Sequence, residues 1–146
     1  MVTNFSKEPR NKEINYDETW MWKRIMNIRT WNVRSLFCSE ALKVLHNELS
    51  KLDFDTVALQ ETQLESGRQK FDNFTLFNSR SESKKHEFGC GFYVREESLK
   101  YVEDLKIINK RICYLRLKAK WFSCTLISVH APTNKKMEEV KEEFYN

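Results

Sequence analysis

The pattern of apolar and polar positions predicts a strand, a helix and a second strand in the first part of the chain. Apolar residues recur from Ile25 to Val33 in the manner of a strand that crosses a core. Residues 39–51 follow a helical pattern, and Ser39 is the expected N-cap. The apolar face of this helix carries Leu42, Leu45, Leu49 and Leu52. Residues 56–60 form a nearly continuous apolar run, which is typical of a strand buried on both faces.

The short links between these elements favour two parallel strands in one sheet. Farther along, residues 74–77 and 89–95 have strand patterns, and residues 111–118 and 122–129 predict an antiparallel hairpin. A charged helix is expected over residues 136–144. We therefore expect an α/β (α+β) fold, with one mixed sheet and helices on one of its faces.

Residues 1–23 differ from the rest of the chain, because they are polar and show little periodicity. We expect this segment to be a disordered leader and residues 24–146 to form one domain. The leader has no apolar stretch of the kind found in secretory signals, and no apolar run is long enough to span a bilayer. These patterns predict an intracellular protein of the nucleus or cytoplasm, with no membrane partner.

The composition indicates a folded domain of mildly basic character. Hydrophobic residues make up 40% of the 146 residues and charged residues 32%, which argues against wholesale disorder. The formal net charge of +4 is compatible with a nucleic-acid partner but does not identify one. The four cysteines form no CxxC pair, so free thiols in a reducing compartment are favoured over a structural zinc site.

Two polar residues stand where the predicted parallel strands end. Asn32 closes the first strand, and Glu61 follows the second. The crevice at the carboxyl ends of parallel strands is the usual ligand site of an α/β sheet. A carboxylate beside an amide suits Mg²⁺, which binds proteins through one or two carboxylates and takes its other ligands from water and phosphate. The alternative interpretation is structural, since Asn is a common turn residue and Glu often begins a solvated helix.

Four short motifs occur along residues 24–146. They begin at Trp31, Ala58, Gly89 and Val129, and they read Trp-Asn-Val-Arg-Ser-Leu, Ala-Leu-Gln-Glu-Thr, Gly-Cys-Gly-Phe and Val-His-Ala-Pro-Thr-Asn. In this order and spacing they resemble the N-terminal half of the endonuclease/exonuclease/phosphatase family. They resemble in particular the apurinic-endonuclease-like domains of non-LTR retrotransposons and the craniofacial development protein 2-like sequences. The resemblance implies the first half of a four-layer α/β sandwich of the DNase I-like type.

The same resemblance implies hydrolysis of DNA phosphodiester bonds with Mg²⁺ or Mn²⁺, and it implies roles for three residues. Asn32 matches the asparagine that helps to orient the scissile phosphate and the surroundings of the metal. Glu61 matches the metal-binding glutamate. His130 falls where many members have a tyrosine that contacts the phosphate. It is therefore either a donor to a phosphate oxygen or simply a polar residue at a strand end.

The chain also departs from the pattern of the family. Arg34 stands where some repair endonucleases have an acidic residue, while Gly89 and Gly91 match positions of close backbone packing. The later Asp-x-Asn and Asp-His motifs are absent, and neither Asp nor His follows His130. We therefore expect a truncated, retroelement-derived domain that is inactive alone and binds its metal weakly. Its incomplete sheet would leave an apolar face that could drive association.

Two other functions remain open. The first is a non-catalytic module that binds nucleic acid or protein through a basic face, although a solvated charged surface explains the same residues. The second is a phosphatase or sphingomyelinase-type member of the same family. The basic residues in question are Lys84, Lys85, Lys106, Lys110, Arg111, Arg116, Lys118 and Lys120.

Overall fold

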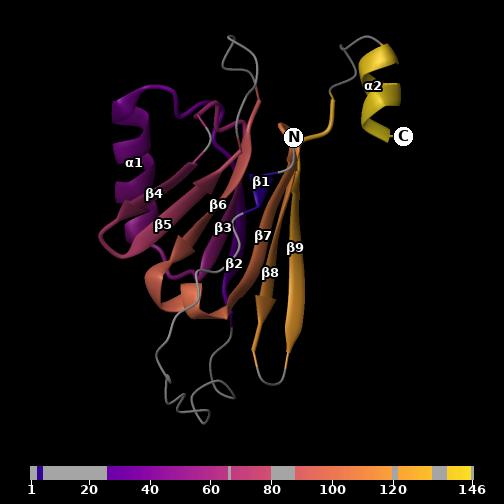
Figure 1. Ribbon diagram of the computed structural model, residues 1–146. Coiled ribbons are helices and arrows are strands. Elements are labelled where there is room, and N and C mark those ends of the chain that lie inside the picture. The colour runs from indigo at the N-terminus through magenta and orange to yellow at the C-terminus, as the bar shows by residue number, and fades with distance from the viewer. Residues whose placement is uncertain are drawn as a thin grey trace.

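The computed structural model contains two β-sheets that pack face to face, with one helix on the outer side of the first sheet (Figure 1). It describes residues 3–4, 26–65, 67–79, 88–119, 122–132 and 138–145. In chain order the elements are β1 (Thr3–Asn4), β2 (Ile28–Asn32), α1 (Ser39–Ser50), β3 (Thr56–Gln60), β4 (Gly67–Phe71), β5 (Phe74–Asn78), β6 (Cys90–Arg95), the 3-10 helix η2 (Glu96–Tyr101), β7 (Val102–Asn109), β8 (Ile112–Lys118), β9 (Ser123–Val129) and α2 (Glu138–Tyr145).

The first sheet is mixed and has five strands in the order β2-β3-β6-β5-β4. Strands β2 and β3 run parallel, as the strand-helix-strand pattern predicted, and the other neighbours are antiparallel. The carboxyl ends of β2, β3 and β5 therefore share one edge of the sheet. This edge lies at the top of Figure 1 and carries the candidate site.

Helix α1 covers the outer face of the first sheet through three of the four leucines that its spacing predicted, whereas Leu52 lies beyond the end of the helix and is 39% exposed. Leu42, Leu45 and Leu49 are buried there against an aromatic cluster that includes Phe54 and Tyr93. The predicted N-cap was wrong. Cys38 occupies that position without a side-chain cap, and the helix already begins at the next residue. The Ser39 hydroxyl donates to the carboxylate of Glu40 at 3.0 Å instead of to the backbone of the helix.

The expectation of a single sheet was wrong in one respect, because this chain also builds a second sheet. Its order is β1-β7-β8-β9, and all of its pairings are antiparallel. Apolar residues from both sheets meet between them, among them Phe92, Leu105 and Leu115, each almost fully buried. The inner face of the first sheet is thus covered by the chain's own second sheet.

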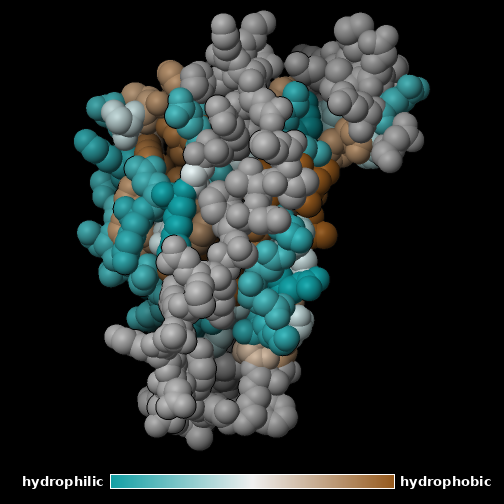
Figure 2. Space-filling model, in the orientation of Figure 1, coloured by the Kyte–Doolittle hydropathy of each residue, from teal (hydrophilic) through white to brown (hydrophobic). Residues whose placement is uncertain are grey.

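The outer face of the second sheet carries exposed apolar side chains. Ile127 and Val129 on β9 are 64% and 46% exposed. Figure 2 shows hydrophobic residues at this side of the molecule and mostly hydrophilic residues over α1. The predicted association through an apolar face therefore stays a prediction, and it now concerns a different face.

Several expectations bear on the two ends of the chain. Helix α2 confirms the helix that was expected over residues 136–144, and its bounds differ from the expected ones by only one or two residues. Thr3 and Asn4 pair with β7, whereas residues 5–25 lie outside the described residues, so the disordered leader stays a prediction. Among the described residues, no helix is long and apolar enough to cross a membrane.

Candidate active site

The three residues that the sequence singled out come together around one carboxylate oxygen. Asn32 Nδ2 donates to Glu61 Oε1 over 2.7 Å, and His130 Nε2 lies 3.2 Å from the same oxygen. The side chains of Glu61 and His130 are 29% and 17% exposed, so the group is partly shielded from water. The structure thus places Asn32 beside Glu61, as expected from the parallel strands, and adds His130 to the pair, while their chemistry stays a prediction.

Pairing within and between the sheets brings these residues into place. The Val33 amide donates to the Gln60 carbonyl at 3.0 Å, which continues the parallel β2-β3 pairing up to Glu61. Gln60 Nε2 then reaches across to the hydroxyl of Ser128 on β9 at 2.9 Å. Because His130 follows β9 directly, this contact between the sheets sets the histidine beside Glu61.

The backbone at this edge is strained. Arg34, Glu61, Gln63 and Phe88 have φ values of 57°, 56°, 54° and 70°, in the left-handed region that side-chain-bearing residues rarely adopt. Each such residue costs on the order of 1 kcal/mol or more and persists only where the surroundings impose it. Strain of this kind gathers at functional sites, and here it gathers in the loops around Glu61.

Glycines confirm the close packing that was predicted for the third motif. Gly89 has a φ of +100°, and a Cβ there would lie 2.5 Å from the hydroxyl oxygen of Thr62. A Cβ on Gly91 would lie 2.3 Å from the carbonyl oxygen of Phe77. Both contacts exclude larger residues, so these glycines have a structural role.

The electrostatic surroundings of His130 favour a neutral imidazole. Burial lowers the pKa of His130, the cation of Arg111 lowers it further, and the carboxylate of Glu61 opposes both effects. A neutral ring close to Glu61 carries its hydrogen on Nε2, where it donates to the carboxylate. Nδ1 then has a free lone pair. It is buried and has no hydrogen-bond partner among the described residues.

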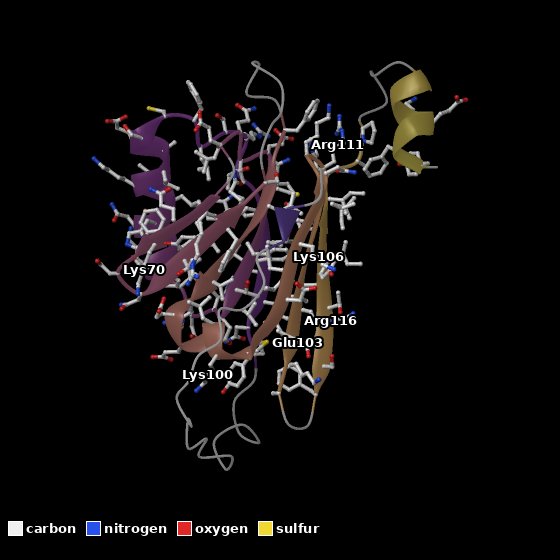
Figure 3. The ribbon with its side chains drawn as sticks, in the orientation of Figure 1. Lys70, Lys100, Glu103, Lys106, Arg111 and Arg116 are labelled. Carbon is white, nitrogen blue, oxygen red and sulfur yellow. The ribbon has the colours of Figure 1, made fainter. Side chains whose placement is uncertain are left out.

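Arg111 is a member of the site that the sequence did not reveal. Its side chain is only 6% exposed, lies 3.9 Å above the ring of Phe88 and donates from Nη1 to the carbonyl of His130 at 3.0 Å. The His130 amide donates in turn to the Arg111 carbonyl at 2.9 Å. Figure 3 shows Arg111 at the upper end of β8, close to the candidate site. Because a strand-edge arginine looks like any surface charge, the sequence pattern assigned it to the basic face.

Two other residues of that basic face lie close to acidic side chains. Lys118 lies 3.0 Å from the carboxylate of Glu103, and Lys106 lies 3.8 Å from that of Asp104. Figure 3 shows Lys106 and Arg116 on the second sheet, below the edge that carries the site. Lys84, Lys85 and Lys120 lie outside the described residues.

The donor set at the site fits a divalent cation only in part. Among the described residues, no group of three His, Cys, Asp or Glu side chains could hold a metal. Glu61 offers a carboxylate at the site, and among the described residues its contacts with Asn32 and His130 engage Oε1 and not Oε2. Proteins nevertheless often bind Mg²⁺ through a single carboxylate ligand, because the ion keeps several waters and binds substrate phosphates. Glu61 therefore fits as one ligand, with Asn32 and His130 as the groups that orient it.

Neither a protein-family model nor a curated protein matches the sequence. Among solved structures, the chain is similar to the crystal structure of the Xenopus laevis APE2 catalytic domain, with a TM-score of 0.55 and 18% sequence identity. The similarity covers 82% of this chain and 51% of that chain, so the present sequence spans about half of its neighbour. At this identity the shared feature is the fold, and the chain has the DNase I-like α/β architecture that its four motifs predicted.

Proposed function

We propose that Asn32, Glu61 and His130 form one side of a site that hydrolyses DNA phosphodiester bonds with Mg²⁺ or Mn²⁺. The observation that carries the proposal is the convergence of the amide and the imidazole on one oxygen of Glu61. This arrangement fixes the carboxylate while its other oxygen remains available. The structural similarity to a catalytic domain supports the proposal.

Each residue has a distinct part in this site. Glu61 would hold the cation, which when bound neutralises charge on the phosphate. Asn32 is itself fixed, because its Oδ1 accepts from the Arg34 amide at 3.0 Å while its Nδ2 holds Glu61. His130 donates its one N–H hydrogen to Glu61 and so holds the carboxylate in place. The Arg111 guanidinium and backbone keep His130 in position.

Hydrolysis also needs a base to activate water, and these three residues do not supply one. The two nitrogen atoms that contact Glu61, Asn32 Nδ2 and His130 Nε2, are committed to orienting it, and the other ring nitrogen of His130 is buried. We propose that turnover depends on Asp and His residues of the kind found in the later motifs of the family, which this sequence lacks. The 146-residue chain is then a binding-competent half of an active site. Its retroelement-like motifs around Asn32 and His130 support an origin in that subgroup.

A cleavage assay tests this function. We expect the purified chain with Mg²⁺ to leave supercoiled plasmid and abasic-site DNA intact, because loss of catalytic partners typically costs several orders of magnitude in rate. The matched control is Glu61→Gln, which keeps the shape of the side chain and removes its charge. Cleavage by the unaltered chain that disappears in the Glu61→Gln variant would contradict inactivity of the chain alone. It would also mean that a residue of this sequence acts as the general base that activates water.

A further inference from the structure

Two buried thiols meet between the sheets, and the function proposed above makes no use of either. Cys90 lies on β6 of the first sheet and Cys113 on β8 of the second. Both are 0% exposed, and neither is in a disulfide. We propose that this pair is an oxidative modification site, at which a small oxidant such as hydrogen peroxide joins the two thiols in a disulfide between the sheets. The inference goes beyond the proposed function and does not depend on it.

The registers of the two sheets place these side chains opposite one another. Cys90 is paired with Gln60 of β3. Cys113 is paired with Ser128 of β9. Gln60 Nε2 donates to the Ser128 hydroxyl at 2.9 Å, so both of these side chains point into the space between the sheets. Directly paired residues carry their side chains on the same face of a sheet. Cys90 and Cys113 therefore point into the same space, one strand farther along in each sheet.

Direct contact and close spacing of the sheets support a bond at this point. The two thiols are hydrogen-bonded to each other, and both belong to the apolar cluster between the sheets. Cα atoms of β6 and β8 approach within 8 Å, which is closer than the roughly 10 Å usual between packed sheets. The strands thus come near the reach of a disulfide, which spans Cα atoms up to about 6.8 Å apart. Antibody domains contain a disulfide between packed sheets.

The surroundings of the two sulfurs give them different parts in the oxidation. The hydrogen bond with Cys113 lowers the pKa of the Cys90 thiol; burial opposes this effect, and the Ser79 hydroxyl adds to it. The hydrogen bond with Cys90 and burial both raise the pKa of the Cys113 thiol. Because the thiolate is the reactive form of cysteine, Cys90 attacks the oxidant first. Full burial of both sulfurs favours peroxide over bulky oxidants such as glutathione disulfide.

The reaction needs no co-reactant besides peroxide. The Cys90 sulfur attacks one peroxide oxygen, the O–O bond breaks, and the departing hydroxide takes the proton of the Cys90 thiol to form water. This step leaves a sulfenic acid on Cys90. The Cys113 sulfur then attacks the Cys90 sulfur, the S–O bond breaks, and the second hydroxide leaves as water with the proton of Cys113. The two thiols together lose two electrons and two protons, and peroxide is reduced to two waters.

The disulfide would join the sheets directly beneath the candidate site. Gln60 immediately precedes Glu61, and Ser128 stands two residues before His130. The bond would close a loop of about 24 residues and so restrict the unfolded chain. The oxidised protein should therefore unfold at a higher temperature than the reduced protein, with a Tm about 5 °C or more above it.

The test oxidises the folded 146-residue chain with a few equivalents of hydrogen peroxide. Remaining thiols are then blocked with N-ethylmaleimide in denaturant, and tryptic peptides are identified by mass spectrometry with and without prior reduction by dithiothreitol. We expect a pair of peptides linked through Cys90 and Cys113 that is absent after reduction. The Tm of the oxidised chain should rise by about 5 °C or more and return to its starting value on reduction.

Two variants and one further condition complete the experiment. Cys38→Ser removes an exposed thiol and should form the same link with the same rise in Tm. Cys113→Ala removes one partner, and its Tm should not rise on oxidation. The proposal is overturned if the oxidised parent chain links Cys90 to Cys38 or Cys124 instead, or lacks the link to Cys113. It is equally overturned if that link forms only when peroxide is added in urea. These outcomes are read from the parent chain, so they do not depend on the folding of Cys113→Ala.

Discussion

Gly91→Ala should destabilise the protein by about 3 kcal/mol or more, at the upper end of the cost of overpacking a well-packed interior. The added Cβ would lie 2.3 Å from the carbonyl oxygen of Phe77 and 3.2 Å from the Cα of Asn78. Both contacts are with backbone in the neighbouring strand β5, so no side-chain rotation relieves them. The central pairing of β5 with β6 must therefore shift, and with it the edge that leads to Glu61. The measurement is the free energy of unfolding from urea titration.

Gly67→Ala is the matched control for this substitution. It also replaces a strand glycine by alanine, but its Cβ meets nothing within 4 Å. We expect it to be neutral or to stabilise the chain by up to about 1 kcal/mol, since alanine restricts the unfolded state more than glycine does. If Gly91→Ala changed the free energy of unfolding as little as Gly67→Ala, then β5 and β6 would not lie as close together as these contacts require.

Leu115→Ala should lower the free energy of unfolding by about 2–5 kcal/mol, the usual cost of deleting a fully buried leucine side chain. Leu115 lies in the middle of β8, is 0% exposed and belongs to the apolar cluster between the two sheets. The prediction concerns the second sheet, which the sequence pattern did not foresee. The measurement is again a urea titration, followed by both tryptophan fluorescence and far-UV circular dichroism.

The control for Leu115→Ala is a substitution on the neighbouring strand β9. Ile127→Ala removes a branched apolar side chain that is 64% exposed, so its cost should stay within about 0.5 kcal/mol. A Leu115→Ala cost as small as that of Ile127→Ala would contradict the packing of the two sheets. His130 would then not be held beside Glu61 by the second sheet.

The parts of the fold that the sequence predicted are those with strong local signals. The leucine spacing of α1, the apolar run of β3 and the hairpin of β8 and β9 are each visible in a short window. Strand β7 was missed because Glu103, Asp104 and Lys106 interrupt its apolar pattern and two register shifts break its alternation. Strand β4 was missed because its sequence, Gly-Arg-Gln-Lys-Phe, carries almost no apolar signal.

The residues of the candidate site likewise include some with a local sequence signal and some without one. Asn32 and Glu61 could be predicted because each stands where an apolar strand ends, and His130 because it lies in a recognisable motif. Arg111 could not, since its role depends on a ring stacked beneath it and on a carbonyl 19 residues away in the chain. The left-handed backbone at Glu61 and Gln63 was equally invisible, because neither residue type favours that conformation.

The central claim is that Glu61 binds a divalent cation while Asn32 and His130 hold the Glu61 carboxylate in place. The most direct measurement is a titration of the ¹⁵N-labelled chain with Mn²⁺, in which paramagnetic broadening marks the amides close to the ion. We predict early, selective broadening at Asn32, Glu61 and His130. It should persist in Glu65→Gln, which removes an exposed carboxylate nearby, and disappear in Glu61→Gln. Broadening at the same amides that is unchanged in Glu61→Gln would contradict the account.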